Sequence, residues 1–95
     1  MKILHLHVKK TYFNQIKSGA KKHEYRRITP YWTKRLVYAP DYNLIMVYCG
    51  YPRKGDSERT LIFPYTGWYI ITSFVHPHFG DQPVDVYAIH LQGVV

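Results

Sequence analysis

The chain has 95 residues, enough for one small domain and too few for a second catalytic domain. Apolar residues make up 46% of it, a share typical of a folded protein and not of a disordered tail. The single cysteine, Cys49, excludes an intrachain disulfide framework and a zinc site built from several thiolates, and a reducing cytoplasm is the expected setting. Residues 1–8 lack the apolar run of a signal peptide, and the uncharged run 60–80 is broken by Pro64 and Gly67, so we expect neither secretion nor a membrane-spanning segment.

The positive charge is unevenly distributed along the chain. The net charge is +7, but residues 1–40 hold ten bases and one acid, a net +9, whereas residues 41–95 hold three bases and five acids, a net −2. Such a one-sided distribution favours a polyanionic partner, with nucleic acid the first choice and an acidic membrane surface the second. Ten tyrosines and two tryptophans strengthen the case for nucleic acid, because unpaired bases stack on aromatic rings. The alternatives are that the lysines only keep a small domain soluble and that the aromatic residues build the core.

The first two predicted elements are a strand and a short helix. Residues 2–8 alternate between apolar and polar side chains, a period typical of a half-buried strand with its histidines on the outer face. The spacing of the apolar residues in 12–18 predicts a two-turn helix that has Thr11 as its N-cap. This helix should end at Gly19, because glycine readily adopts the left-handed backbone of a C-cap.

The next part of the chain predicts a basic strand followed by a second helix. Residues 21–27 are rich in lysine and arginine, and we interpret them as an extended strand. Thr29 and Pro30 form a typical cap and first-turn pair, which predicts a short helix over residues 31–36. Residues 40–43 are then expected to form a turn.

The remainder of the chain predicts strands. Residues 44–49 form a short, uncharged run rich in β-branched side chains, which is typical of a strand buried on both faces. The segment 50–59 is polar and contains glycine and proline, so it is interpreted as a loop. Further strands are expected at 60–65, 68–75 and 84–91.

This order of elements indicates the fold class. Two short helices near the N-terminus, followed by a run of strands, are typical of an α+β fold. We interpret residues 1–95 as a single domain built as a small, partly open β-barrel of five to six strands with two short flanking helices.

The densest cluster of chemically active side chains surrounds Glu24, the one acid in the basic part of the chain. In strand geometry Lys22, Glu24 and Arg26 share one face, so that Arg26 can orient the carboxylate. A bend near Gly19 could bring the side chain of Lys21 to the same cleft opening as Glu24.

The pattern Gly-x-Lys-x-x-Glu-x-Arg, here Gly19, Lys21, Glu24 and Arg26, resembles the hallmark of ASCH domains. Along its whole length the chain is similar to small ASCH-type proteins common in phage and prophage genomes. The resemblance implies a PUA-like fold, a small β-barrel with flanking helices and a cleft proposed to bind RNA. Some ASCH-type relatives are assigned nucleoside amidohydrolase activity that uses a lysine and a threonine nucleophile. Glu24 stands where those enzymes have the threonine, so that arrangement is not expected here.

The first functional hypothesis is a module that binds RNA, a nucleotide or a nucleoside. Basic side chains would neutralise phosphate, Glu24 would accept a hydrogen bond from a base or sugar, and Tyr25 or Trp32 would stack on a base. The plainer alternatives are a structural ion pair for Glu24 with Arg26, and core packing for Tyr25 and Trp32. The candidate nucleic-acid-binding residues are Lys9, Lys10, Lys21, Lys22, Glu24, Tyr25, Arg26, Arg27, Trp32, Lys34 and Arg35.

Two other classes of function remain open. The chain could be a hydrolase acting on a modified nucleoside or on RNA, with Lys21 and Glu24 as a catalytic, proton-handling pair. If phage-encoded, it could instead bind a host protein through its basic surface. The pairs His5-x-His7 and His76-x-His78 have a spacing that suits zinc, but no third ligand accompanies either pair. We therefore expect no metal, no cofactor and no membrane partner.

Overall fold

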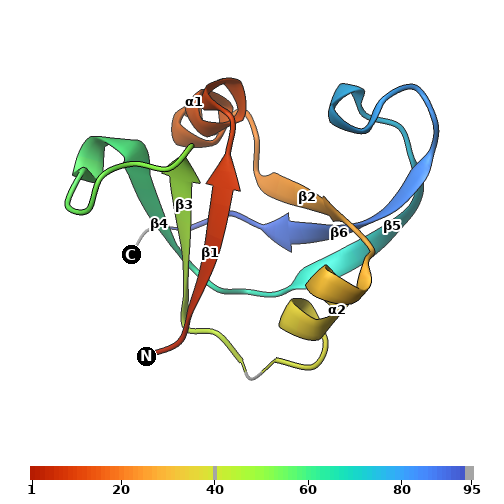
Figure 1. The fold of residues 1–95 in the computed structure, drawn as a ribbon, viewed down its shortest axis with the longest axis horizontal. Coiled ribbons are helices and arrows are strands. Elements are labelled where there is room, and N and C mark those ends of the chain that lie inside the picture. Colours follow the sequence, from red (N-terminus) through yellow and green to blue (C-terminus); the bar gives the residue numbers. More distant parts are fainter. Residues whose placement is uncertain (40, 94–95) are drawn as a thin grey trace.

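Six strands and two helices make up the part of the chain that the structure describes, residues 1–39 and 41–93 of a computed structural model (Figure 1). They are β1 (Ile3–Val8), α1 (Lys10–Ser18), β2 (His23–Arg27), α2 (Pro30–Leu36), β3 (Leu44–Cys49), β4 (Thr60–Pro64), β5 (Trp68–Phe74) and β6 (Val84–His90), with short 3-10 turns η1 (Ser57–Arg59) and η2 (Pro77–Phe79). The α+β class is confirmed. Of the turn expected over residues 40–43, Pro40 lies outside the described residues.

The strands form two separate sheets. The first sheet has the order β1-β3-β4, with β1 parallel to β3 and β3 antiparallel to β4. The second sheet has the order β2-β6-β5 and is antiparallel throughout. No strand ladder joins the two sheets within residues 1–39 and 41–93, so the described strands do not close into a barrel. Consequently β1 and β2 are both edge strands, and each has backbone groups that need other partners.

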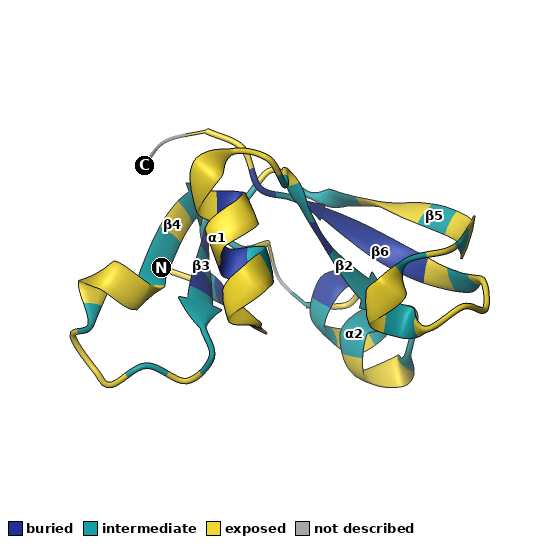
Figure 2. Ribbon diagram, turned by 90° about the horizontal axis from the view of Figure 1, so that it is seen from above, coloured by how far each residue is buried: buried dark blue, intermediate teal, exposed yellow. Residues whose placement is uncertain are grey.

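The hydrophobic core lies between the two sheets and beneath α1. Leu6 of β1 and Ile45 and Val47 of β3 are fully buried, and they meet Ile89 of β6 from the second sheet. Figure 2 shows β6 as the most continuously buried strand and the outer surfaces of α2 and β5 as exposed. The predicted alternation of β1 is confirmed, because its leucines and valine face this core while its histidines face outward.

The prediction that residues 44–49 are buried on both faces is wrong. Ile45 and Val47 are fully buried, but Met46 and Tyr48 on the opposite face are only half-buried. The outer face of β3 is therefore only partly covered. A strand can thus have one face at the surface although its sequence does not alternate between apolar and polar residues, because methionine and tyrosine tolerate partial exposure.

The start of α1 also differs from the prediction, whereas its end agrees. The helix begins at Lys10 with Lys9 as its N-cap, and no side chain caps it. Thr11, the predicted N-cap, lies inside the first turn instead. Gly19 is the C-cap as expected, with a left-handed φ of 85° and its N–H bonded to the carbonyl of Ile16.

The caps of α2 hold this helix against the second sheet. Thr29 accepts a hydrogen bond from the backbone N–H of Trp32 at 3.3 Å, and Pro30 occupies the first helical position, so the predicted N-terminus is confirmed. At the other end, the indole N–H of Trp68 donates to the carbonyl of Leu36 at 3.3 Å. No helix in the described residues is long and apolar enough to cross a membrane.

Candidate functional site

A pocket lies between the edge strands β1 and β2 and beside the turn η2. It encloses about 90 Å³ and opens to solvent. We call it the Glu24 pocket, and its lining residues are His7, Val8, Lys9, Tyr12, Lys21, Glu24, Tyr25, Arg26, His76, His78 and Phe79.

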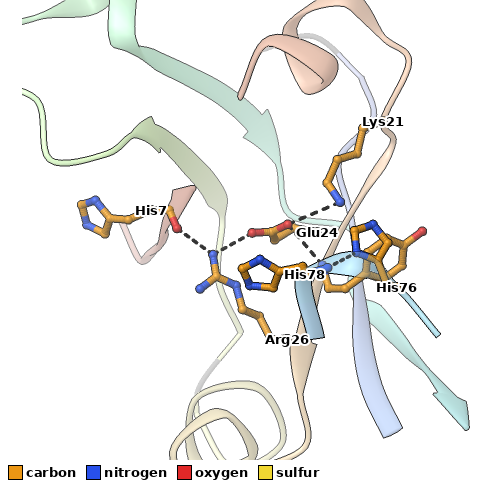
Figure 3. Close-up of polar contacts among 7 residues, drawn as sticks. His7, Lys21, Glu24, Arg26, His76 and His78 are labelled. Carbon is orange, nitrogen blue, oxygen red and sulfur yellow. Dashed lines mark hydrogen bonds and ion pairs between the residues drawn. The ribbon is translucent and has the colours of Figure 1, made fainter. Parts of the chain in front are cut away.

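Glu24 is at the centre of this pocket and is only 7% exposed. Its Oε2 accepts a hydrogen bond from Nη2 of Arg26 at 2.7 Å, and its Oε1 lies 3.6 Å from Nζ of Lys21 (Figure 3). The backbone N–H of Tyr25 also donates to Oε1, at 3.3 Å. A buried carboxylate is stable only when cations and donors replace its lost hydration, and these three partners do so.

Arg26 connects the two sheets across their open edges. Its Nη2 atom donates to the backbone carbonyl of His7 on β1, at 2.9 Å, as well as to Glu24. This hydrogen bond takes the place of the backbone N–H that a neighbouring strand would donate to the same carbonyl. The guanidinium carbon lies 5.0 Å from the ring centroid of Trp32, while Nε is buried without a hydrogen-bond partner among the described residues. The ion pair with Glu24 offsets that cost.

Lys21 reaches the pocket because the chain bends after Gly19. The backbone N–H of Lys21 bonds to the carbonyl of Gln15, and β2 begins only at His23, so strict strand alternation does not apply to Lys21. Its Nζ atom lies 4.4 Å from the ring centroid of Tyr25. Burial lowers the pKa of Lys21 below its ordinary value, although the Glu24 carboxylate acts in the opposite direction. The prediction that Lys21 and Glu24 lie at the same cleft opening is confirmed.

Two histidines on the far side of the pocket come from the turn η2 and the residue before it. Nδ1 of His76 accepts a hydrogen bond from the backbone N–H of His78 at 3.1 Å, so neutral His76 carries its proton on Nε2. The His76 ring stacks against Phe74 at 5.7 Å. Burial, and then the positive charge of Lys21, lowers the pKa of His76. A lowered pKa favours the neutral form of the His76 ring beside the cationic pocket.

The structure brings together some of the predicted binding residues and separates others. Lys9, Lys21, Glu24, Tyr25 and Arg26 line the Glu24 pocket. The predicted residues that lie outside it are Lys10, Lys22, Arg27, Trp32, Lys34 and Arg35.

Two of the residues outside the pocket have contacts that explain their positions. Trp32 is half-buried, packs against the core and supports Arg26, so it offers no stacking face to the pocket. Arg35 stacks on Tyr31, with its guanidinium carbon 3.4 Å from the ring centroid, and donates to the Tyr31 carbonyl at 3.2 Å.

Sequence reasoning did not assign six lining residues to this site, which are His7, Val8, Tyr12, His76, His78 and Phe79. The spacing of His76 and His78 suggested only a metal pair, and no group of three potential metal-binding side chains occurs among the described residues. No local pattern assigned these histidines to the site, because the turn η2 reaches the pocket only through the pairing of β5 and β2 with β6 in one sheet.

The chemistry of the pocket is that of a cationic, aromatic-lined cleft. Lys9, Lys21 and Arg26 outweigh the single charge of Glu24, and the rings of Tyr12 and Tyr25 flank Lys21. Such a cleft suits an anion that carries a flat ring. Comparison with protein-family models, with curated proteins and with solved structures finds no match to this chain.

Proposed function

We propose that the Glu24 pocket binds one nucleotide, either within RNA or as a small molecule. The observation that carries the proposal is the buried Glu24 carboxylate, held in place by Lys21 and Arg26 beside the rings of Tyr12 and Tyr25. A fixed carboxylate can accept hydrogen bonds from a base or ribose, and the cations at the mouth can neutralise phosphate. A pocket of about 90 Å³ is too small for a duplex, which favours an unpaired nucleotide.

We further propose that the protein is an ASCH-like module with a PUA-like architecture. The motif residues support this proposal by their positions, because Gly19 ends α1 while Glu24 and Arg26 lie in β2, a helix-to-strand junction. On this view the two sheets correspond to a PUA-like barrel that is open both between β1 and β2 and between β4 and β5. Phage origin, a cytoplasmic setting and a host-protein partner stay predictions.

A hydrolase is the second candidate, and one observation favours it. Nζ of Lys21 lies 3.6 Å from Glu24, and burial lowers the pKa of this lysine. A lysine with a lowered pKa is better suited to proton transfer near neutral pH than an ordinary one. On this candidate Lys21 and Glu24 would exchange protons with a modified nucleoside or with RNA.

One experiment separates the two candidates. Amide NMR spectra of the labelled protein are recorded during titration with a short mixed-sequence RNA, and separately with nucleosides that include acetylated cytidine. If the pocket binds nucleotides, the shifted resonances belong to residues 7–9, 21–26 and 76–79. Consumption of a nucleoside during the titration identifies a hydrolase.

Matched variants control this titration. Lys21→Gln, inside the pocket, should weaken binding and reduce its dependence on salt, since one phosphate contact is lost. Lys34→Gln removes the same charge on α2, outside the pocket, and should have a smaller effect on both. Shifts confined to α2, or equal effects of the two variants, would contradict a site at Glu24.

A further inference from the structure

The outer face of the first sheet bears an ordered stack of aromatic rings. His5 and His7 point outward from β1, and His7 pairs in register with Tyr48 of β3. The ring centroids of His7 and Tyr48 are 4.8 Å apart, and those of His7 and Tyr51 are 4.3 Å apart, with interplanar angles of 21° and 18°. His5 extends the stack at the other end, 5.7 Å from Tyr48. Four rings from a strand pair and its adjoining loop thus lie nearly parallel.

Hydrogen bonds hold these rings in place. Nδ1 of His7 bonds to the carbonyl of Gly50 at 2.7 Å, and since a carbonyl only accepts, Nδ1 carries the proton. Nε2 of neutral His7 is then an acceptor. Nδ1 of His5 bonds to the hydroxyl of Tyr48 at 2.7 Å. A platform ordered in this way loses little conformational entropy when another flat ring stacks on it.

The stack ends at a ring that is open to solvent. Tyr51 is 87% exposed although its ring stacks on that of His7, so the ring remains accessible to a further stacking partner. It lies at the side of a groove of about 470 Å³ that we call the outer groove. The outer groove is lined on the sheet by His7, Met46, Tyr48 and Ile62 and along the loop by residues 51–57.

The charge of this loop complements a polyanion. Arg53 and Lys54 line the outer groove and are exposed, and no carboxylate of the described residues lies within salt-bridge distance of either. Asp56, the acid in the same wall, already lies 3.7 Å from Arg59. Aromatic rings next to unneutralised cations are the combination that binds single-stranded nucleic acid, because bases stack while phosphates are neutralised.

His7 connects the outer groove with the Glu24 pocket, since it lines both. Figure 3 shows its backbone carbonyl directed toward Arg26 and its ring on the opposite side. We propose that single-stranded RNA continues from the Glu24 pocket over His7 to the outer face of the first sheet, where a neighbouring base stacks on Tyr51. This inference rests on the proposed function, which concerns the pocket alone, and it adds a second subsite.

The test compares a ligand that can reach both subsites with ligands that can reach only one. Binding of a mixed-sequence RNA hexamer and of the four ribonucleoside monophosphates is measured by NMR titration for the wild type, Tyr51→Ala and Tyr51→Phe. Tyr51→Ala should weaken hexamer binding by about five-fold or more, the lower end of what one stacked base contributes. It should leave monophosphate binding unchanged, and Tyr51→Phe should keep the affinity for the hexamer because the ring remains.

Controls make the outcomes distinct. Tyr38→Ala removes an equally accessible tyrosine, 78% exposed, that follows α2 and lines neither cavity, and it should not affect either ligand. Hexamer binding by Tyr51→Ala that equals the wild type, or a wild-type hexamer affinity no higher than that of a monophosphate, would overturn the second subsite and leave the pocket intact. Absence of wild-type binding to all of these ligands would overturn the proposed function and the second subsite together.

Discussion

At the residue scale, Glu24 determines both the stability and the chemistry of the pocket. Its carboxylate is the one buried charged group among the residues described, and Lys21, Arg26 and the backbone of Tyr25 supply its partners. Removing one member of a buried ion pair leaves the other charges desolvated without compensation. The pocket is therefore a place where function and stability depend on the same side chain.

Glu24→Gln should lower the free energy of unfolding. The amide keeps the volume of the side chain but leaves Lys21 and Arg26 without a negative partner, and the expected loss is about 3 kcal/mol, at the low end for a buried pair because Arg26 remains partly exposed. Urea unfolding followed by circular dichroism measures it. Glu58→Gln, the same change at an exposed glutamate in η1, should alter stability by less than about 0.5 kcal/mol. Equal losses in the two variants would show that Glu24 is not held as described.

At the element scale, the positions of α1 and α2 follow from how each helix begins and ends. Helix α1 precedes β2 and α2 follows it. The end of α1 therefore influences the position of Lys21, and the start of α2 influences that of Arg26. The end of α1 at Gly19 permits the bend that carries Lys21 toward Glu24. The start of α2 at Thr29 places Trp32 against the guanidinium of Arg26.

Substitutions at two threonines test which of them acts as a helix N-cap. Thr29→Ala should lower the free energy of unfolding by about 1 kcal/mol, because the N–H of Trp32 loses its side-chain acceptor. Thr11→Ala should be neutral or slightly stabilising, since Thr11 lies in the exposed first turn of α1, where alanine is the better helix former. Thermal or urea unfolding of both variants measures the difference. A larger loss for Thr11→Ala would support Thr11 as the N-cap and contradict the observed start of α1.

At the scale of the whole molecule, the protonation of histidines makes the free energy of unfolding depend on pH. The protein already carries +7, and burial lowers the pKa of His23 and His76 below the ordinary value of 6.5. A lowered pKa in the folded state means that the unfolded chain binds more protons at the same pH. These histidines therefore favour folding above pH 6.5, and that contribution is lost as the pH falls through their folded-state pKa values.

The free energy of unfolding should thus decrease between about pH 7 and about pH 5, a range in which most carboxylates stay ionised. His76→Gln cannot be protonated, so its stability should depend less steeply on pH than that of the wild type. Urea titrations at several pH values measure both slopes. Parallel curves for the two proteins would show that His76 is equally easy to protonate in the folded and unfolded states.

Local patterns in the sequence determined much of the fold. The alternation in β1, the glycine after α1 and the Thr-Pro pair before α2 each depend on neighbours a few residues away, so they could be predicted without knowing the tertiary structure. The same holds for the clustering of Lys21, Glu24 and Arg26, because they lie in one short stretch of chain. The α+β class followed from the order of these elements.

Only the tertiary structure decided which distant segments complete the site. His76 and His78 reach the pocket because β5 and β2 flank β6 in one sheet, and Tyr51 meets His7 because β1 pairs in parallel with β3. Strand order and register depend on contacts between residues far apart in the chain, to which local periodicity is insensitive. For the same reason the gap between β1 and β2, which Arg26 bridges, has no signature in the sequence, although it is where the pocket forms.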